Sequence, residues 1–433
     1  MRARRWHHLL RLIDFVPLVP LAPLAPLAAG AACKTPPQVV PAESTSSSNS
    51  TPAPAPTREP EPVAPPSAAP IGTALDAGAD ARAVSAQGCR PLRGPVELPL
   101  RSPAALALRG DALDVVLNDD GRPRTIAFPV AAPAPAAVSA REPAEGGARA
   151  GYAVPCAVAG QRVFCSDRTG AVRRAARDGS GDRIVASSRT ASRIAAASLG
   201  GTHEALAYLA SRQTTEGWVS EAWLAVDDEA PVRLSEDGAG ATFVTLVPHG
   251  AGAVALGLDA RAALSAMHVR PVTFEGKADL GEDVVVFVGG PGDRRMTAAL
   301  ALPSSGQAWA LLPIARDMTT FGVAAVRVDD PPRVDEPVVW STYPNGLDPA
   351  PIAVAIAAGQ TWVARVRPVG PEPTAARTIE LGVLHADGSF VPNGTLPVGA
   401  KPADVSLAVD AHGTAWVAWT DGDGSWLERV ACK

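Results

Sequence analysis

The chain has 433 residues, a net charge of −5 at pH 7 and only 5% aromatic residues. This length exceeds that of one small domain and allows a large closed β-fold behind an N-terminal tail. A slightly acidic chain of mixed charge lacks the basic face of nucleic-acid-binding proteins, so we expect no nucleic-acid partner.

Residues 1–32 have the composition of a secretory signal peptide. A basic start, MRARRWHHLLR, precedes the apolar stretch LIDFVPLVPLAPLAPLAAGAAC, which ends in small residues. This order of a positive region, an apolar region and a small-residue cleavage site is typical of secretory signals. A membrane-spanning helix is the alternative, but proline recurs at every third position from Pro17 to Pro26, and each proline removes a backbone donor. The sequence therefore predicts export.

The segment LAAGAAC, which ends at Cys33, resembles the lipobox of bacterial lipoproteins. Gly30 departs from the family's preference for Leu three residues before the cysteine. The resemblance implies that Cys33 becomes a lipidated N-terminus and that the protein is anchored in the cell envelope, at the outer membrane. Cleavage near Ala31 followed by free secretion is the alternative.

Residues 33–86 are predicted to form a disordered tether behind that anchor. From Lys34 to about Pro70 the segment is dominated by Pro, Ser, Thr and Glu and has too little apolar surface to form a core. A segment of this kind spans roughly 40 Å or more. It would hold the folded domain, residues 87–433, away from the membrane surface.

Four cysteines lie in the predicted folded domain, an even number that favours two disulfides in an exported protein. Within CAVAGQRVFC, a two-residue turn at Gly160-Gln161 places Cys156 opposite Cys165. Glycine at the first position suits a type II′ turn, and such a cysteine pair has Cα atoms roughly 4.5 Å apart, within the range of a disulfide. The remaining pair is Cys89 with Cys432. No zinc-type spacing occurs, and we expect no metal and no other cofactor.

The folded domain contains a repeated unit. An alternating apolar run precedes a glycine, and a large apolar residue follows three places later, as in AGQRVFC, SGQAWAL, AGQTWVA and HGTAWVA. The residues at this place are Val163, Trp309, Trp362 and Trp416. The glycines of the stronger and weaker copies are Gly110, Gly160, Gly201, Gly250, Gly306, Gly359 and Gly413. A period of about fifty residues with short alternating strands predicts an all-β fold, a β-propeller.

We predict seven blades of about four antiparallel strands, with six or eight blades as alternatives. The first unit is interrupted by AAPAPAAVSAREPAEGGARAG, which has the composition of a surface loop. The last unit is one strand short, and residues 94–100, GPVELPL, can supply that strand from the other end of the domain. This closure would hide an exposed sheet edge, and a Cys89–Cys432 disulfide would lock it.

The last unit, VDAHGTAWVAW, resembles repeats of NHL, streptogramin-lyase-like and related propellers, in which D-x-x-G precedes a W-V strand. The resemblance implies the fold and transfers no catalytic residue. Asp410 and His412 are residue types found in metal and catalytic clusters, but an Asp at a turn commonly bonds its own backbone. We therefore interpret both as turn residues, and Trp416 as packing between blades.

Familiar catalytic and nucleotide-binding motifs are absent from the sequence. The histidines beyond the signal are scattered among different units: His203, His249, His268, His385 and His412. We therefore expect a monomeric binding or scaffolding module with a protein or glycan ligand. An envelope hydrolase or lyase with its site at the mouth of the propeller channel is the alternative.

Fold-level analogy places a ligand on one rim of the propeller, near the channel, at the loops between second and third strands. The candidate contacts on these loops are Arg212, Arg261, Arg316 and Asp317. Solvated loop charges are the alternative interpretation of these four residues.

Overall fold

The computed structural model describes residues 88–92, 94–130, 156–187, 193–215, 217–236, 240–261, 264–288, 299–302, 308–315, 320–328, 338–340, 343–344, 351–369, 376–398 and 402–432. The predicted signal peptide, Cys33 and the whole predicted tether lie outside these ranges. The described residues form strands and turns without a helix. A helix of membrane-spanning length and apolarity is accordingly absent from them.

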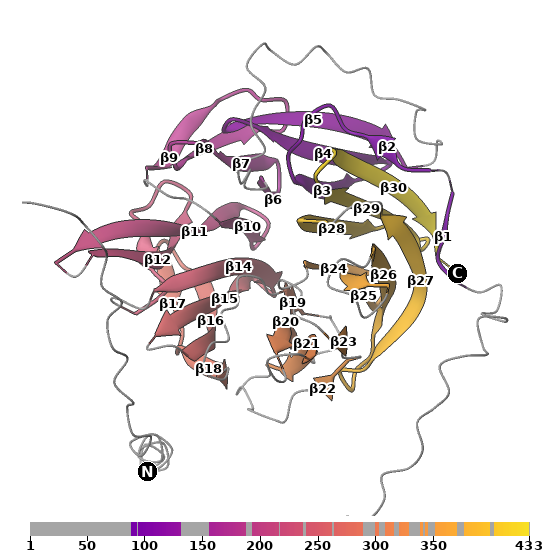
Figure 1. Ribbon diagram of the computed structural model, residues 1–433. Coiled ribbons are helices and arrows are strands. Elements are labelled where there is room, and N and C mark those ends of the chain that lie inside the picture. The colour runs from indigo at the N-terminus through magenta and orange to yellow at the C-terminus, as the bar shows by residue number, and fades with distance from the viewer. Residues whose placement is uncertain are drawn as a thin grey trace, which may run out of the picture. The chain divides into compact units, whose positions relative to one another are not determined.

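The described residues fold into a β-propeller of seven blades, as the repeat predicted. The blades are antiparallel sheets that follow one another around a ring in chain order (Figure 1). We number them blade 1 to blade 7 along the chain, and in each the first strand is the innermost one.

The strands of blades 1 to 3 are β3 (Ala104–Arg109), β4 (Ala112–Asp119), β5 (Arg122–Pro129); β6 (Ala157–Ala159), β7 (Arg162–Ser166), β8 (Ala171–Ala176), β9 (Arg183–Ser187); β10 (Ile194–Leu199), β11 (His203–Thr214), β12 (Gly217–Val226) and β13 (Val232–Arg233). Those of blades 4 and 5 are β14 (Ala241–His249), β15 (Gly252–Arg261), β16 (Leu264–Phe274), β17 (Ala278–Leu280), β18 (Val284–Val288); β19 (Ala299–Ala301), β20 (Trp309–Ala315), β21 (Thr320–Arg327), β22 (Val338–Val339) and β23 (Tyr343–Pro344).

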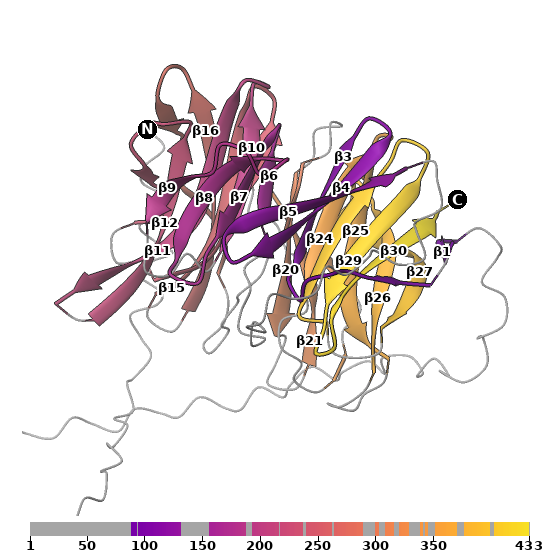
Figure 2. The ribbon, with the colours of Figure 1, turned by 90° about the horizontal axis from the view of Figure 1, so that it is seen from above.

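The strands of blades 6 and 7 are β24 (Ile352–Ala357), β25 (Gln360–Pro368), β26 (Arg377–Leu384), β27 (Phe390–Val398); β28 (Asp404–Val409), β29 (Thr414–Thr420) and β30 (Ser425–Ala431), with β1 (Arg90–Pro91) and β2 (Val96–Glu97) from the start of the domain. Seen edge-on, the ring shows turns at its two rims (Figure 2). We call the rim that carries the turns between second and third strands the 2–3 rim.

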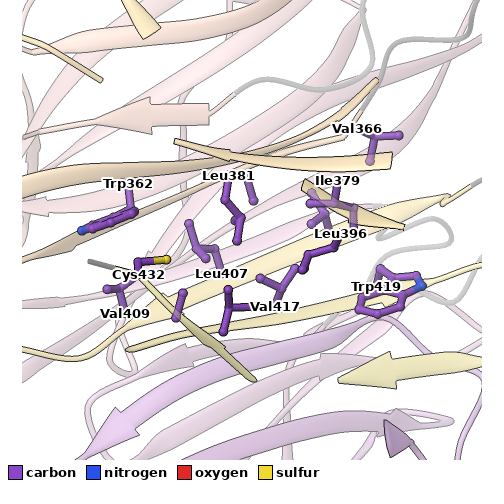
Figure 3. Packing of buried hydrophobic residues seen from close by; sticks show 14 of the residues in the cluster. Trp362, Val366, Ile379, Leu381, Leu396, Leu407, Val409, Val417, Trp419 and Cys432 are labelled. Carbon is purple, nitrogen blue, oxygen red and sulfur yellow. The ribbon is translucent and has the colours of Figure 1, made fainter. Parts of the chain in front are cut away.

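The second strand of each blade is buried on both faces, because neighbouring blades cover it from two sides. In β25, Val363 packs against blade 5, whereas Trp362 and Ala364 pack against blade 7. Figure 3 shows the blade 6–7 interface, where Leu381 faces Leu407 and Val417. Side chains of a strand alternate between its faces, so each such strand reads as a continuous apolar run.

The recurrent aromatic residue fills the interface with the following blade, and an alanine stands opposite it in the sheet. Trp362 pairs with Ala355, Trp416 with Ala408 and Trp309 with Ala301. The small partner leaves room for the large ring, since protein interiors are close-packed. Trp416 is fully buried between blades 7 and 1, which confirms its predicted packing role.

The predicted equivalence of Val163 with these tryptophans is wrong by one residue. Val163 faces the preceding blade, and Phe164, opposite Ala157, takes the aromatic place. The turns explain the shift: Gly160 opens its two-residue turn with φ +53°, whereas Gly359 closes a turn in which Ala358 also has positive φ. A glycine count therefore misaligns blades whose hairpins use different turn types.

The ring is closed by the N-terminal segment, as predicted, and both expected disulfides are present. β2 and β1 pair antiparallel with β30, and Cys89 is joined to Cys432. The Cys89 amide also donates to the Asn393 carbonyl of blade 6 at 2.5 Å. The closing segment thus fastens blade 7 and also reaches the neighbouring blade.

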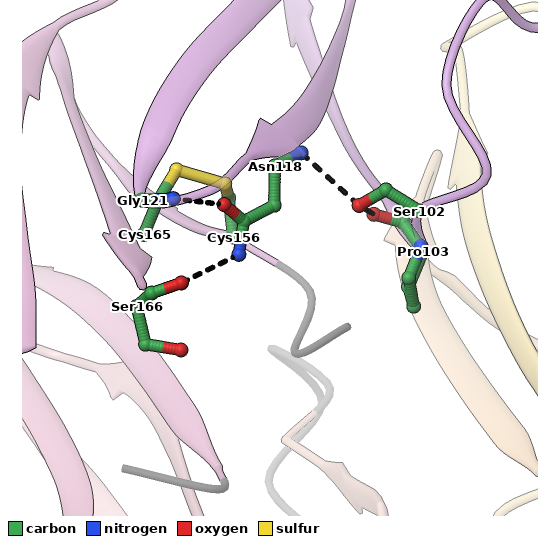
Figure 4. Close-up of a disulfide and its surroundings, with 7 residues drawn as sticks. All are labelled: Ser102, Pro103, Asn118, Gly121, Cys156, Cys165 and Ser166. Carbon is green, nitrogen blue, oxygen red and sulfur yellow. Dashed lines mark hydrogen bonds between the residues drawn. A yellow bond between two sulfur atoms is a disulfide. The ribbon is translucent and has the colours of Figure 1, made fainter. Parts of the chain in front are cut away.

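Blade 2 has the smallest described apolar contact with its predecessor, formed by Val116, Cys156, Val163 and Cys165. The Cys156–Cys165 disulfide lies inside this contact, with a Cα–Cα distance of 4.4 Å. Beside it, the Asn118 side chain of blade 1 donates to the Ser166 carbonyl at 2.8 Å (Figure 4). Near the opposite rim Arg177 reaches the buried carboxylate of Asp114 at 2.5 Å. A hydrogen bond and an ion pair between the blades therefore supplement a thin hydrophobic contact here. The disulfide joins two residues of blade 2 and contributes its sulfurs to that contact.

The two disulfides should contribute unequally to stability. Chain-entropy arguments give about 6 kcal/mol for the bridge that closes 343 residues, and about 3 kcal/mol for the one that closes nine. We expect the Cys89→Ala/Cys432→Ala variant to lose more free energy of unfolding than the matched Cys156→Ala/Cys165→Ala variant. Denaturant titration of both variants measures this, and the reverse order would contradict the locking role of the ring-closing bridge.

Candidate functional site

A cavity lies between blades 3 and 4, and charged residues of blade 4 are among those that line it. Its volume is about 30 Å³, enough for one water-sized group. Blade 3 contributes Ala222, Leu234 and the exposed Glu236. Blade 4 contributes a polar wall made of Asp259, His268, Arg270 and Asp283.

His268, on β16, is held between two carboxylates. Its Nε2 lies 2.9 Å from Asp259 on β15, and its Nδ1 lies 3.3 Å from Asp283, which directly precedes β18. The side chain of Asp259 is 5% exposed, and those of His268 and Asp283 are 19% and 21% exposed. Contacts at both ring nitrogens fix the imidazole orientation.

Electrostatics keep His268 charged at neutral pH. Burial by itself would lower its pKa, but the hydrogen bonds and charges of Asp259 and Asp283 outweigh burial and raise the pKa to about 9. The imidazolium therefore donates to both acids. Such a group orients carboxylates well and is poorly suited to accept a proton at neutral pH.

A glycine creates the space beside this cluster. Gly257 stands opposite His268 in the sheet, and a Cβ placed there would meet only the Phe243 carbonyl oxygen, at 3.9 Å. The corresponding cross-strand pairs of other blades carry larger side chains: Tyr208 with Trp223, Arg365 with Glu380, and Trp419 with Trp426. The cavity follows from the missing side chain at this one place.

Arg270 bridges the two blades beneath the cluster. Its guanidinium donates to the Leu234 carbonyl of blade 3 and to the Gly281 carbonyl of blade 4, each at 3.0 Å. Both of these contacts are to backbone carbonyls, so Arg270 ties blade 3 to blade 4 at this interface.

The predicted rim residues do not gather into one described site. The Arg212 guanidinium lies 2.9 Å from the fully buried Glu221, which also contacts Arg233, on the blade 2 side of β12. Arg261 ends β15 at the 2–3 rim, near Asp259, but its side chain is outside what the structure describes. Arg316 and Asp317 lie outside the described residues, so the proposed role of this set stays a prediction.

Asp410 is a turn residue, as the sequence indicated. Its Oδ1 accepts hydrogen bonds from the amides of His412 and Thr414, both at 2.8 Å. Asp167 makes the same pair of contacts in blade 2, with Thr169 and Ala171. The arrangement stabilises a loop, and His412 is exposed on it.

The ring separates His268 from the other histidines. His203, His249, His385 and His412 lie at turns on the rim opposite the 2–3 rim. His203 contacts Asp227 there at 2.7 Å. Within the described ranges no three of His, Cys, Asp and Glu are grouped so as to hold a metal ion.

Two charged residues mark the channel at the 2–3 rim. Arg193 precedes β10 of blade 3, with its guanidinium 5.7 Å from the centroid of the Phe243 ring. Asp404 begins β28 of blade 7, where burial raises its pKa to about 6 although the charge of Arg193 opposes the shift. The alternative channel-mouth site therefore has a carboxyl group, Asp404, and a cationic guanidinium, Arg193, among its described residues.

Sequence reasoning found the histidine but not its partners. His268 was one of five scattered histidines, and Asp259 and Asp283 were not singled out because neither belongs to a motif. Alternation on β16 would have placed His268 and Arg270 on one face. Only pairing with β15 and β18 brings the aspartates to that face.

Comparisons with known proteins found no matching family model and no match among curated proteins. Among solved structures, a lectin mutant from Aleuria aurantia is 11% identical, with a TM-score of 0.38 over 63% of this chain and 91% of the lectin. A neuraminidase-like protein of subtype N10 from an influenza virus of the little yellow-shouldered bat is 6% identical (TM-score 0.42, 65% and 94% coverage). The N-terminal domain of Nup159 is 12% identical (TM-score 0.42, 80% and 94%).

The His268 cluster predicts a fall in stability at alkaline pH. Its folded-state pKa of about 9 exceeds the ordinary 6.5, so its contribution is complete below pH 6.5 and is lost as the pH rises through 9. The shift corresponds to about 3 kcal/mol. Denaturant titrations between pH 6 and 10 should show this fall in the wild type and not in His268→Gln, and equal slopes would contradict it.

Glu428 on β30 provides a second pH effect in a separate window. It is 4% exposed, and burial raises its pKa from 4.5 to about 7. An acid with a raised pKa disfavours the folded state once ionised, so stability should fall between pH 4.5 and 7 by up to about 3 kcal/mol. Glu428→Gln should remove this fall while leaving the one between pH 6.5 and 9, as measured in denaturant titrations extended down to pH 4.

Proposed function

We propose that this protein is an exported binding propeller, anchored to the cell envelope through Cys33, whose ligand engages the 2–3 rim. The observation that carries the binding role is the cavity between blades 3 and 4, which Asp259, His268 and Asp283 help to line. Ligand sites combine concave shape with a few well-placed polar groups, as this cavity does.

The chemistry of His268 supports binding rather than proton transfer. A histidine that accepts a proton in catalysis has a pKa near the working pH, whereas that of His268 is raised to about 9. The cluster is suited to presenting oriented hydrogen-bond acceptors. A hydrolase with its site at Asp404 in the channel stays the alternative, since a carboxyl of pKa about 6 is suited to acid–base chemistry.

Two disulfides support export. Disulfides form and persist in oxidising compartments, and here one joins the two ends of the ring and the other joins two residues within blade 2. Three features of the sequence also indicate export: the signal-like start, the lipobox-like segment and the Pro-rich tether. A lipid on Cys33 would attach the domain to a membrane through that tether.

Substitution of Cys33 tests the proposed lipid anchor. We expect Cys33→Ala to move the protein from the membrane fraction to the soluble fraction, because it removes the atom that carries the lipid. Ser46→Ala, in the tether, is the matched control and should stay with the membrane. Mass spectrometry of the wild-type N-terminus should show a diacylglycerol-modified Cys33; an unmodified N-terminus near Ala31 would overturn the anchor and favour secretion.

A further inference from the structure

Resting on the proposed binding function, we propose that the 2–3 rim of blades 3 and 4 binds an oligosaccharide, with one sugar ring on Trp218 and one hydroxyl-bearing group in the cavity beside Asp259. The argument uses an exposed aromatic, the strand face that connects it to the cavity, and the chemistry of the cavity wall.

Trp218 is the exposed aromatic. It lies next to the tip of the β11–β12 hairpin, which extends outward past the neighbouring blades (Figures 1 and 2). Its relative exposure is 55%, whereas Trp309, Trp340, Trp362, Trp416 and Trp419 are 6% exposed or less. An indole kept at the surface of a projecting hairpin offers a large, rigid contact area to a ligand.

One face of the hairpin leads from Trp218 to the cavity. Trp218, Ser220 and Ala222 are alternate residues of β12 and share a face, and Ala222 lines the cavity. The directly opposite residues of β11 on that face are Gln213 and Ser211. Strand rise places Trp218 roughly 13 Å from Ala222, which is longer than one sugar ring.

The composition of this face fits a saccharide. A sugar ring has a flat apolar face and hydroxyl groups around its edge. Trp218 supplies the apolar surface, and Ser220, Ser211 and Gln213 supply small polar groups along the way. A chain of several sugar rings matches the distance and the alternation of these contacts.

The cavity wall fits a hydroxyl group. Asp259 and Asp283 are held by the His268 imidazolium, so their carboxylates are oriented before any ligand arrives. A volume of about 30 Å³ admits a single hydroxyl or hydroxymethyl group. Glu236 is the third carboxylate that lines this cavity, whereas His268 and Arg270 are its two cations. This excess of negative charge disfavours phosphate-bearing ligands.

The test is a broad glycan array probed with the full-length protein, followed by calorimetric titration with the tetrasaccharides that bind. We expect Trp218→Ala to weaken binding at least tenfold. Gly257→Ala should weaken it several-fold, because its methyl group enters the cavity without meeting any atom closer than 3.9 Å. Ile356→Ala, which truncates a 42% exposed apolar residue on blade 6, is the matched control and should bind as the wild type does.

Thermal unfolding of each variant separates loss of binding from loss of folding, since Trp218 is 55% exposed and a Cβ at Gly257 meets no atom closer than 3.9 Å. Absence of binding to every saccharide on the array overturns the inference, as does binding that neither Trp218→Ala nor Gly257→Ala weakens. A peptide library probed in parallel distinguishes failure of the oligosaccharide proposal from failure of the general binding function. Peptide binding that is sensitive to Trp218→Ala, without saccharide binding, would overturn the oligosaccharide and leave the binding function standing.

Discussion

The structure depends on burial of both faces of each blade's second strand. A strand covered on one side only would expose one of its two faces, and the middle parts of these strands have buried apolar residues on both faces. The chain solves this by placing each blade between two others, and a linear stack would leave its two end blades uncovered. A closed ring is therefore required, and the contact between blades 7 and 1 around Trp416 is as necessary as any contact between blades that are consecutive in the chain.

Closure explains why the covalent links are where they are. The N-terminal strands complete the sheet of blade 7, and the Cys89–Cys432 bridge joins the two ends of the domain at that sheet. The second bridge joins two residues of blade 2 and places its sulfurs in the contact with blade 1, where few large apolar side chains are available. Of the two bridges, the first joins segments that are far apart in the chain.

The candidate site is an exception to the same packing rule. At the place where other blades put Tyr208, Arg365 or Trp419, blade 4 has Gly257, and the space is bordered by ionised groups rather than filled. An apolar side chain in this space would stabilise the interface through added packing contacts. A buried, charged His268 instead needs two well-placed carboxylates to offset its loss of hydration. A departure of this kind from good packing is expected at sites that serve a ligand.

The sequence alone determined the fold class, the number of blades, both disulfides and the strand that closes the ring. These are local consequences: alternation, glycine turns and cysteine parity repeat along the chain and need no knowledge of distant contacts. It missed the exact alignment of Val163 and Phe164, because two turn types place glycine differently. It also missed the partners of His268, because Asp259, His268 and Asp283 meet only when β15, β16 and β18 pair, and the cavity beside them exists only when blade 3 packs against that sheet. Tertiary structure decided the site, since its geometry depends on contacts between strands and between blades that no local pattern specifies.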